Sequence, residues 1–204
     1  QHLGAPTAAA SFPREKKFVA WLDEIKKDAA AIFLVGDLFD FWFEYETVVP
    51  KGFVRTLGKL AEIRDAGIPI YFFVGNHDLW MNDYFEKELN IPVYHKPQEF
   101  IIDTKKFFKW LHPDLGVKLG HFMSVKNKAI SGDEDAKYLG DEKEWLVIYS
   151  KYKLTQQHYD YFVFGHRHLP LEITLPQNSK YINLGDWINY FTYGEFAKDS
   201  YHLR

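Results

Sequence analysis

Three short polar strings, each placed directly after an apolar run, constrain the fold of this chain more than any other feature. The strings are GDLFD at 36–40, GNHD at 75–78 and GHRH at 165–168, and the runs before them are AIFLV, PIYFFV and YFVF. Apolar runs of this kind, closed by glycine and a polar residue, are typical of buried parallel strands that end in a loop. We therefore expect three strands of an α/β sheet with polar carboxyl ends.

These strand ends predict one ligand site. Open α/β sheets bind their ligands outside the carboxyl ends of the strands, so the three strings are expected to meet in a single crevice. Carboxylate, amide oxygen and imidazole in one place suit a borderline divalent metal such as Mn, Fe or Zn. The side chains that would supply these groups are those of Asp37, Asp40, Asn76, His77, Asp78, His166 and His168.

Length and composition are those of one globular domain. A chain of 204 residues is long enough to bury a substantial core without disulfides or structural metals. Its net charge of −3 gives no general attraction to nucleic acid. It has no cysteine, which excludes disulfides and thiolate ligands. No apolar stretch approaches the ~20 residues that span a bilayer, and no signal peptide is recognisable.

The apolar spacing predicts alternating helices and strands over most of the chain. We expect Pro13 to start the first helix and Gly67 to stop the second. Helices are predicted at 13–29, 52–65, 79–89, 106–130 and 141–154. Strands or short extended segments are predicted at 31–35, 69–74, 91–95, 98–103, 161–164, 171–175, 180–184 and 187–193. The expected fold is an α/β sandwich of one domain with a helical insertion.

The order of QHLGAP, GDLFDFW, GNHD and GHRH resembles the calcineurin-like metallophosphoesterases. More narrowly, FDFWFEY, HPDLGVKL, SVKNKAISGDEDAKYLG and LGDWINYFTY resemble the UDP-2,3-diacylglucosamine pyrophosphohydrolases of lipid A biosynthesis, over nearly the whole chain. The resemblance implies a four-layer α-β-β-α sandwich in one domain, residues 1–204, with a helical lid inserted at about 106–140.

Two family features are absent from the sequence. The family begins with Asp-x-His, of which only His2 is present, and it carries a Gly-His-Gly-Asp string between GNHD and GHRH. Gly120-His121 lies inside a helical pattern instead of at a strand end, so we reject it as a substitute. The change from strand to helix around 104–107 has no turn signal. We therefore expect residues to be missing before Gln1 and near 105, with a pseudoenzyme as the alternative.

The resemblance also implies a ligand set for two divalent metal ions. Asp37 would bridge the two ions, because one carboxylate has two oxygens with spare lone pairs. His2 and His168 would complete the first ion, and Asn76 and His166 the second. Mn²⁺ is the expected metal, with Fe, Zn or Mg as alternatives. Two ions so held can provide a hydroxide and clamp a phosphoryl oxygen.

The catalytic roles implied by the family fall on the same loops. His77 would protonate the leaving oxygen or stabilise charge on phosphorus, and Asp40 would orient His77. Asp78 is expected to brace the loop. For Asp40 and His77 the alternative is a structural hydrogen-bonded pair, and for His166 and His168 it is a surface loop pair.

The implied reaction is hydrolysis of UDP-2,3-diacylglucosamine to UMP and 2,3-diacylglucosamine 1-phosphate (lipid X). The resemblance further implies a cytoplasmic protein that is peripherally associated with the inner membrane. The apolar side chains expected to build the lid are Phe107, Phe108, Trp110, Leu111, Leu115, Leu119 and Phe122. The expected substrate contacts are Asn76, His77, Trp42, Lys126, Asn127 and Lys128.

Each of these assignments has a simpler alternative. Trp42 fits core packing as well as a substrate wall, the Phe and Trp stripe of 107–122 is typical of helix packing, and Lys126 and Lys128 are typical of a solvated face. For the whole protein, the alternatives are a general phosphodiesterase or nucleotide phosphatase, and a metal-free scaffold on the same fold.

Overall fold

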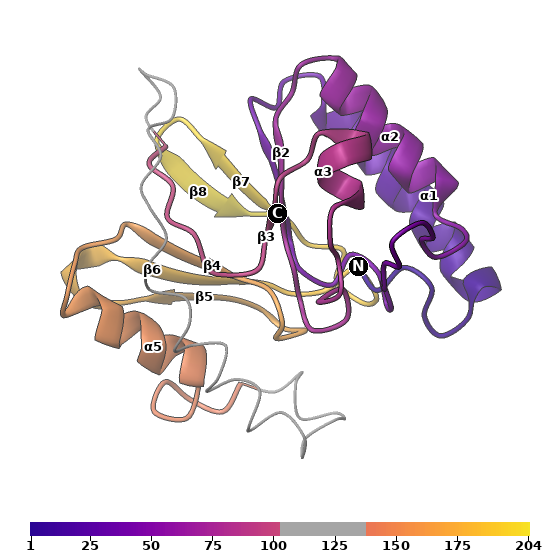
Figure 1. Ribbon diagram of the computed structural model, residues 1–204. Coiled ribbons are helices and arrows are strands. Elements are labelled where there is room, and N and C mark those ends of the chain that lie inside the picture. The colour runs from indigo at the N-terminus through magenta and orange to yellow at the C-terminus, as the bar shows by residue number, and fades with distance from the viewer. Residues whose placement is uncertain (103–137) are drawn as a thin grey trace. The chain divides into compact units, whose positions relative to one another are not determined.

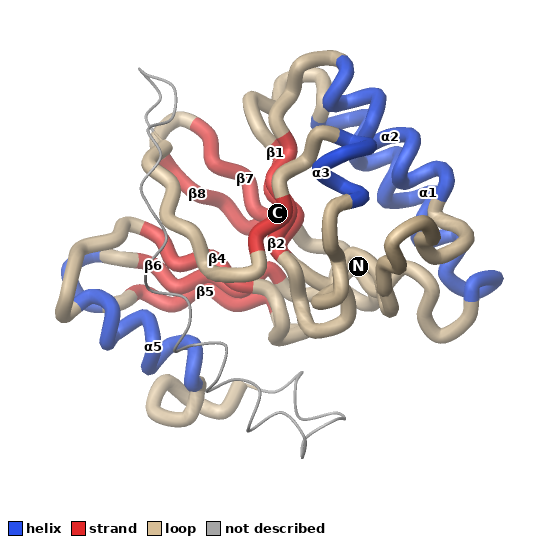
Figure 2. Tube along the Cα trace, viewed as in Figure 1, coloured by secondary structure: helices blue, strands red, loops and turns tan. Residues whose placement is uncertain are grey.

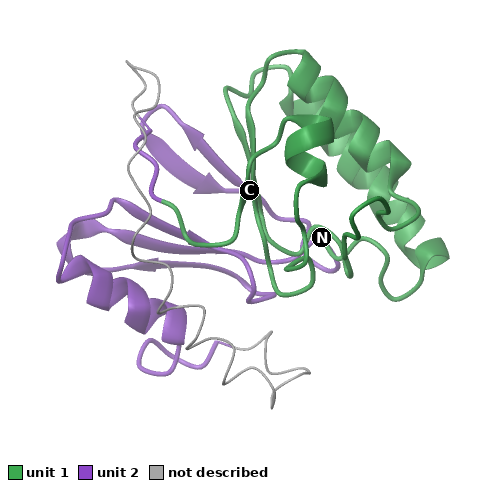
Figure 3. Ribbon diagram, in the orientation of Figure 1, with its two compact units in different colours: residues 1–98 green, residues 99–204 purple. Residues whose placement is uncertain are grey.

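The computed structural model describes residues 1–102 and 138–204, which form two compact units, 1–98 and 99–204 (Figure 3). The predicted helix 106–130 and the apolar lid side chains lie outside the described residues, as do Lys126, Asn127 and Lys128. In the described part of the chain, no helix combines the length and apolarity needed to cross a membrane.

The first unit is a parallel sheet accompanied by helices. Its strands run in the order β1-β2-β3, and all neighbours are parallel, with Ile32 opposite Ile70 and Phe72 opposite Val93. Helices α1 and α2 lie side by side, and α3 lies next to α2 (Figure 1). The elements are α1 (Ala8–Ile25), β1 (Ile32–Val35), α2 (Val54–Asp65), β2 (Ile70–Phe73), α3 (Tyr84–Leu89) and β3 (Val93–Tyr94).

The second unit is a mixed sheet with one helix packed on it. Strand β6 lies between β4, to which it is parallel, and β5, to which it is antiparallel. Buried side chains of α5 form a core cluster with Phe162 and Tyr181 of the sheet. The elements are α5 (Trp145–Leu154), β4 (Tyr161–Phe164), β5 (Pro170–Thr174), the 3-10 turn η2 (Pro176–Asn178), β6 (Lys180–Leu184) and the antiparallel hairpin β7 (Gly194–Ala197) and β8 (Ser200–Leu203).

The first helix begins five residues before the predicted Pro13. Its N-cap is Thr7, whose side-chain oxygen accepts a hydrogen bond from the Ala10 N–H at 3.2 Å. The alanines that follow are strong helix formers, so the cap and the propensity together outweigh the proline signal. Gly67 ends the second helix as predicted: it has φ +87°, and its N–H reaches the Arg64 carbonyl.

Three other predicted elements differ from the structure. Residues 79–83 are a loop, because the Glu44 carboxylate accepts the N–H groups of Asp83 and Tyr84 and thereby delays the start of α3. Residues 98–102 form no strand. The predicted strand at 187–193 is a turn followed by loop, and the last two strands come after it (Figure 2).

The turn at 187–190 has a specific cause. The buried Asp186 carboxylate accepts hydrogen bonds from the backbone N–H groups of Ile188, Asn189 and Tyr190, at 3.0, 2.7 and 3.3 Å. A side chain that binds the next backbone N–H groups competes with a strand ladder. The apolar spacing of this segment therefore misleads, and Asp186 is the residue that indicates the turn.

Candidate active site

The first two polar strings meet at the carboxyl ends of neighbouring strands, as predicted. GDLFD follows β1 and GNHD follows β2, and the two loops touch at glycines. A Cβ atom on Gly75 would lie 2.1 Å from Asp37 Oδ1 and 2.6 Å from the Asp37 backbone nitrogen. Only glycine allows this approach. It lets Asp37 Oδ1 accept the His77 backbone N–H at 3.0 Å.

His2 lies against both carboxylates of the first string. Its backbone N–H donates to the Asp37 carbonyl at 2.9 Å, which ties the residue to the end of β1. Its Nε2 lies 3.9 Å from Asp37 Oδ2, and its Nδ1 lies 3.5 Å from Asp40 Oδ1. The imidazole meets the His77 ring edge-on, with 4.5 Å between centroids. The first unit thus brings His2, Asp37, Asp40 and His77 together.

Asp40 contacts His77 mainly through its backbone carbonyl. His77 Nδ1 lies 2.7 Å from the Asp40 carbonyl oxygen and 3.6 Å from Asp40 Oδ1. A carbonyl oxygen only accepts, so Nδ1 is the nitrogen that carries the hydrogen in this contact. The other ring nitrogen, Nε2, is then the atom that can exchange a proton with a substrate.

The donor set fits a divalent metal ion. One ligand atom from each of His2, Asp40 and His77 lies within 4.8 Å of the others. Imidazole and carboxylate donors suit Mn, Fe or Zn. The geometry therefore groups His2 with Asp40 and His77 as well as with Asp37. The sequence analysis predicted that, within this unit, His2 shares a metal ion with Asp37 alone. Asn76 lies on the same loop and is exposed.

Asp78 braces the loop, as predicted. It is fully buried, and its two carboxylate oxygens accept the backbone N–H groups of Gly75 at 2.5 Å and Leu38 at 2.9 Å. One side chain thus links the two strand ends. Burial is the largest cause that raises the pKa of Asp78, to about 6, although the hydrogen bond from Gly75 acts in the opposite direction.

Three of the predicted metal ligands have left-handed backbone conformations. The φ angles of His2, Asp37 and His166 are 49°, 50° and 71°. A non-glycine residue held in this region costs about 1–3 kcal/mol and persists only where its surroundings fix it; such residues cluster at functional sites. Among the described residues, these are three of ten non-glycine residues with positive φ.

In the second unit, the GHRH loop follows β4 as predicted and is held by partners that sequence reasoning missed. Asn183 Nδ2 donates to the Gly165 carbonyl at 2.8 Å. Arg167 donates to the buried Glu144 carboxylate at 3.2 Å. Asp186 Oδ2 lies 3.8 Å from His168 Nδ1. Asn183 and Asp186 belong to the string NLGDW. Polar residues inside an otherwise apolar segment were the feature of the sequence that could have indicated these two partners.

Trp42 belongs to the core and is not exposed to a substrate. Its side chain is fully buried against Phe39 and Phe85, with ring centroids 4.4 and 5.5 Å away, and its Nε1 donates to Glu44 at 2.8 Å. The alternative of core packing is therefore correct for this residue. Its side chain packs in the core of the first unit and does not form a substrate wall.

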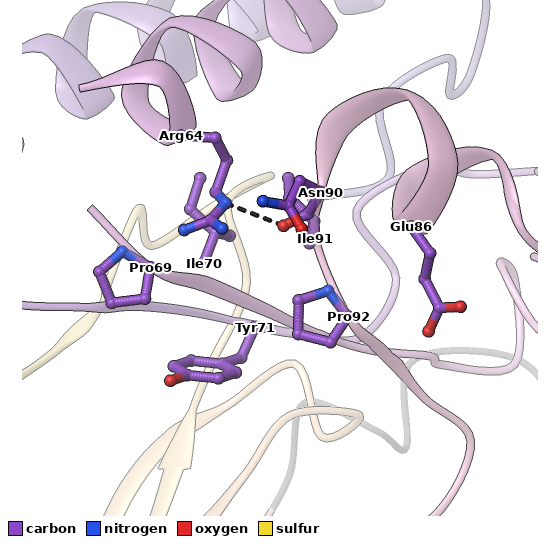
Figure 4. Close-up of a pocket in the computed structure, with 8 residues that line it drawn as sticks. All are labelled: Arg64, Pro69, Ile70, Tyr71, Glu86, Asn90, Ile91 and Pro92. Atoms are coloured by element: carbon purple, nitrogen blue, oxygen red, sulfur yellow. Dashed lines mark hydrogen bonds between the residues drawn. The ribbon is translucent and has the colours of Figure 1, made fainter. Parts of the chain in front are cut away.

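A hollow elsewhere in the first unit is unrelated to these residues. It lies at the start of β2, the end opposite GNHD, and Arg64 there donates to the Asn90 carbonyl at 2.9 Å (Figure 4). Its lining is Arg64, Pro69, Ile70, Tyr71, Glu86, Asn90, Ile91 and Pro92. This set lacks the imidazole and clustered carboxylates of the strand ends, so the chemistry is assigned to the loops.

Known proteins resemble this chain over most of its length. A family model described as calcineurin-like phosphoesterase matches residues 12–170. A Porphyromonas gingivalis protein named UDP-2,3-diacylglucosamine hydrolase is 34% identical, over 94% of this chain and 89% of its own length. A protein of the same name from Shewanella sp. is 24% identical over 83% of this chain and 80% of its own length. Another from Proteus mirabilis is 32% identical over 44% of this chain and 36% of its own length.

Proposed function

Because the chain belongs to the calcineurin-like phosphoesterase family, we propose that it hydrolyses the pyrophosphate of UDP-2,3-diacylglucosamine to UMP and 2,3-diacylglucosamine 1-phosphate. The observation that carries the proposal is the meeting of His2, Asp37, Asp40 and His77 at the ends of two parallel strands. The substrate is proposed from the name of the Porphyromonas gingivalis relative, whose match covers 94% of this chain.

Members of the family use a pair of divalent metal ions, and the imidazoles and carboxylates of the first unit fit such ions. We propose Mn²⁺ as the metal. When bound, the pair supplies Lewis acidity, which lowers the pKa of water and neutralises charge on phosphoryl oxygens. The residues proposed to hold it are His2, Asp37, Asn76, His166 and His168.

His77 is proposed as the general acid. The Asp40 carbonyl fixes its Nδ1–H, so a protonated ring presents its Nε2–H toward the leaving phosphate oxygen. The same contact prevents the ring from turning. The competing assignment makes Asp40 and His77 metal ligands together with His2, a set that the distances also allow. Metal content distinguishes the two: His77→Ala should retain both ions and lose most turnover if His77 is the acid.

The ligand set proposed here is incomplete without the Gly-His-Gly-Asp string of the family. The alignment with the Porphyromonas gingivalis relative runs over 236 positions, more than the 204 residues of this chain. That relative therefore has residues inside the aligned region that have no counterpart here. This supports the expectation that residues of the family pattern are missing from this sequence.

The remaining parts of the proposal concern the lipid portion of the substrate. We propose a four-layer sandwich of one domain with a lid at about 106–140, whose apolar side chains contact the acyl chains. Lys126, Asn127 and Lys128 are proposed as polar contacts. Association with the cytoplasmic face of a membrane is proposed because a substrate with two acyl chains resides in lipid.

Phosphorus NMR tests the reaction directly. The full-length natural protein with Mn²⁺ should convert the pyrophosphate signals of UDP-2,3-diacylglucosamine into two monophosphate signals, those of UMP and the sugar 1-phosphate. Efficient cleavage of bis(p-nitrophenyl) phosphate with no effect on the nucleotide lipid would instead show a general phosphodiesterase. A full-length protein without bound metal, and without activity after addition of Mn²⁺, would be a scaffold.

A further inference from the structure

The backbone of His2 is strained, and helix α1 supplies contacts that hold it in addition to the hydrogen bond from its N–H to the Asp37 carbonyl. His2 is buried and has φ 49°, a left-handed conformation that side chains rarely adopt. In that conformation its imidazole faces Asp37 and Asp40. Relaxation of the backbone would turn the imidazole away, so whatever fixes the main chain at this point also fixes the ligand geometry.

Two polar side chains on one face of α1 hold the turn. Arg14 Nη2 donates to the His2 carbonyl at 2.7 Å and to the Ala5 carbonyl at 2.6 Å. Ser11 Oγ accepts the Gly4 N–H at 2.7 Å. Hydrogen bonds from a charged donor are about twice as strong as neutral ones. The His2 carbonyl also accepts the Ala5 N–H at 3.1 Å, which closes the turn on itself.

We propose that Arg14 and Ser11 are positioning residues of the metal site, which act through the backbone of His2 to aim its imidazole at Asp37 and Asp40. The inference rests on the proposed function only in that His2 binds a metal ion. It assigns a role in ligand geometry to α1, a helix that carries none of the predicted ligands. Neither residue is proposed to contact substrate or metal.

The alternative is that Arg14 only stabilises the fold, and Arg64 provides the matched control. Arg64 lies in the same unit and also donates to two backbone carbonyls. It donates to Asn90 at 2.9 Å (Figure 4), and to Ile68, just before β2, at 3.0 Å. The substitutions Arg14→Met and Arg64→Met remove the same chemistry from two places. Arg14→Lys keeps the charge and should restore part of the affinity.

The experiment titrates Mn²⁺ alone into metal-depleted, full-length natural protein by isothermal calorimetry, with the melting temperature measured in parallel. Arg14→Met should weaken the binding of one ion about 10- to 100-fold, as outer contacts of metal ligands do. Arg64→Met should lower the melting temperature without a change in Mn²⁺ affinity. In the metal-free protein, hydrogen exchange at Gly4 and Ala5 should accelerate in the Arg14 variant only.

Equal Mn²⁺ affinity in the wild type and Arg14→Met would overturn the inference. So would a loss of affinity in both arginine variants that follows their melting temperatures. If Arg14→Met fails to fold, Ser11→Ala replaces it, with Ser150→Ala as control because the Ser150 hydroxyl donates to the Leu146 carbonyl within α5. A wild type that binds Mn²⁺ but leaves the nucleotide lipid intact would refute the proposed substrate and leave this inference standing.

Discussion

At the scale of single residues, backbone strain and metal-ligand chemistry coincide at His2, Asp37 and His166. The strings GDLFD, GNHD and GHRH indicated Asp37, His77 and His166 because their side chains suit a metal-dependent hydrolase. The structure adds that Asp37 and His166 have left-handed backbones. The sequence does not predict which group binds which: the Asp40 carbonyl, and not only its carboxylate, holds His77. Such contacts depend on loop paths that short-range patterns do not encode.

Gly75 should be indispensable for the site. In Gly75→Ala, the new Cβ would meet Asp37 at both Oδ1 and the backbone nitrogen, so the Asp37 loop must move. We expect a loss of about 1–3 kcal/mol in unfolding free energy and a marked loss of Mn²⁺ affinity. Urea unfolding and calorimetry measure the two effects.

The control for this prediction is Gly58→Ala. Gly58 lies in α2 with nothing within 4 Å of an added Cβ, so alanine should stabilise the helix by about 0.5–1 kcal/mol and leave Mn²⁺ binding unchanged. Unchanged Mn²⁺ binding in both variants would mean that the contact between the two loops has no role in metal binding.

At the scale of elements, the apolar runs predicted strands far better than loops. β4 and β6 have the predicted bounds, and β1 and β2 lie within one residue of theirs, because buried strands need continuous apolar residues. The turn at 187–190 and the loop at 79–83 were missed because single carboxylates, Asp186 and Glu44, bind backbone N–H groups there. An apolar pattern does not reveal a side chain that replaces a ladder hydrogen bond.

The GHRH loop should depend on the residue before α5. Glu144 is almost fully buried and accepts from both Arg167 and the Leu139 N–H. Glu144→Gln removes the charge that partners the Arg167 guanidinium, so we expect a loss of about 1–3 kcal/mol in unfolding free energy. Glu172→Gln, which neutralises one side of the half-exposed Glu172–Lys180 pair, should cost less than about 1 kcal/mol. Equal effects of the two substitutions in urea unfolding would refute the special role of Glu144.

At the scale of the whole molecule, the family assignment rests on a match that runs through both units. The sequence predicted that all three strings meet in one crevice. Within the first unit, two of them do. The GHRH loop belongs to the second unit, and its place relative to the other two strings stays a prediction. Motifs report which family a chain belongs to, whereas the path of a long insertion depends on contacts that its own sequence does not specify.

Stability of the metal-free protein should depend on pH through Asp78. Its pKa of about 6 in the folded protein lies above the value of about 3.9 in an unfolded chain. The folded state therefore binds this proton more tightly, and the associated stability is complete below about pH 4 and is lost as the pH rises through about 6. The shift corresponds to about 3 kcal/mol.

The contribution of Asp78 to the unfolding free energy is isolated by comparing the wild type with Asp78→Asn from about pH 4 to about pH 7. The wild type should lose stability relative to the variant across that range, even though the variant also loses one backbone contact at every pH. Parallel profiles would show that Asp78 keeps an ordinary pKa in the folded protein.

The measurement that tests the central claim most directly is the number of Mn²⁺ ions bound by the full-length natural protein, counted by electron paramagnetic resonance after metal depletion. We predict two ions per chain with a spin-coupled signal, loss of that signal in Asp37→Asn, and its retention in Asp40→Asn. A wild type that binds no Mn²⁺, or an Asp37→Asn variant that binds both ions as tightly as the wild type, would contradict the account.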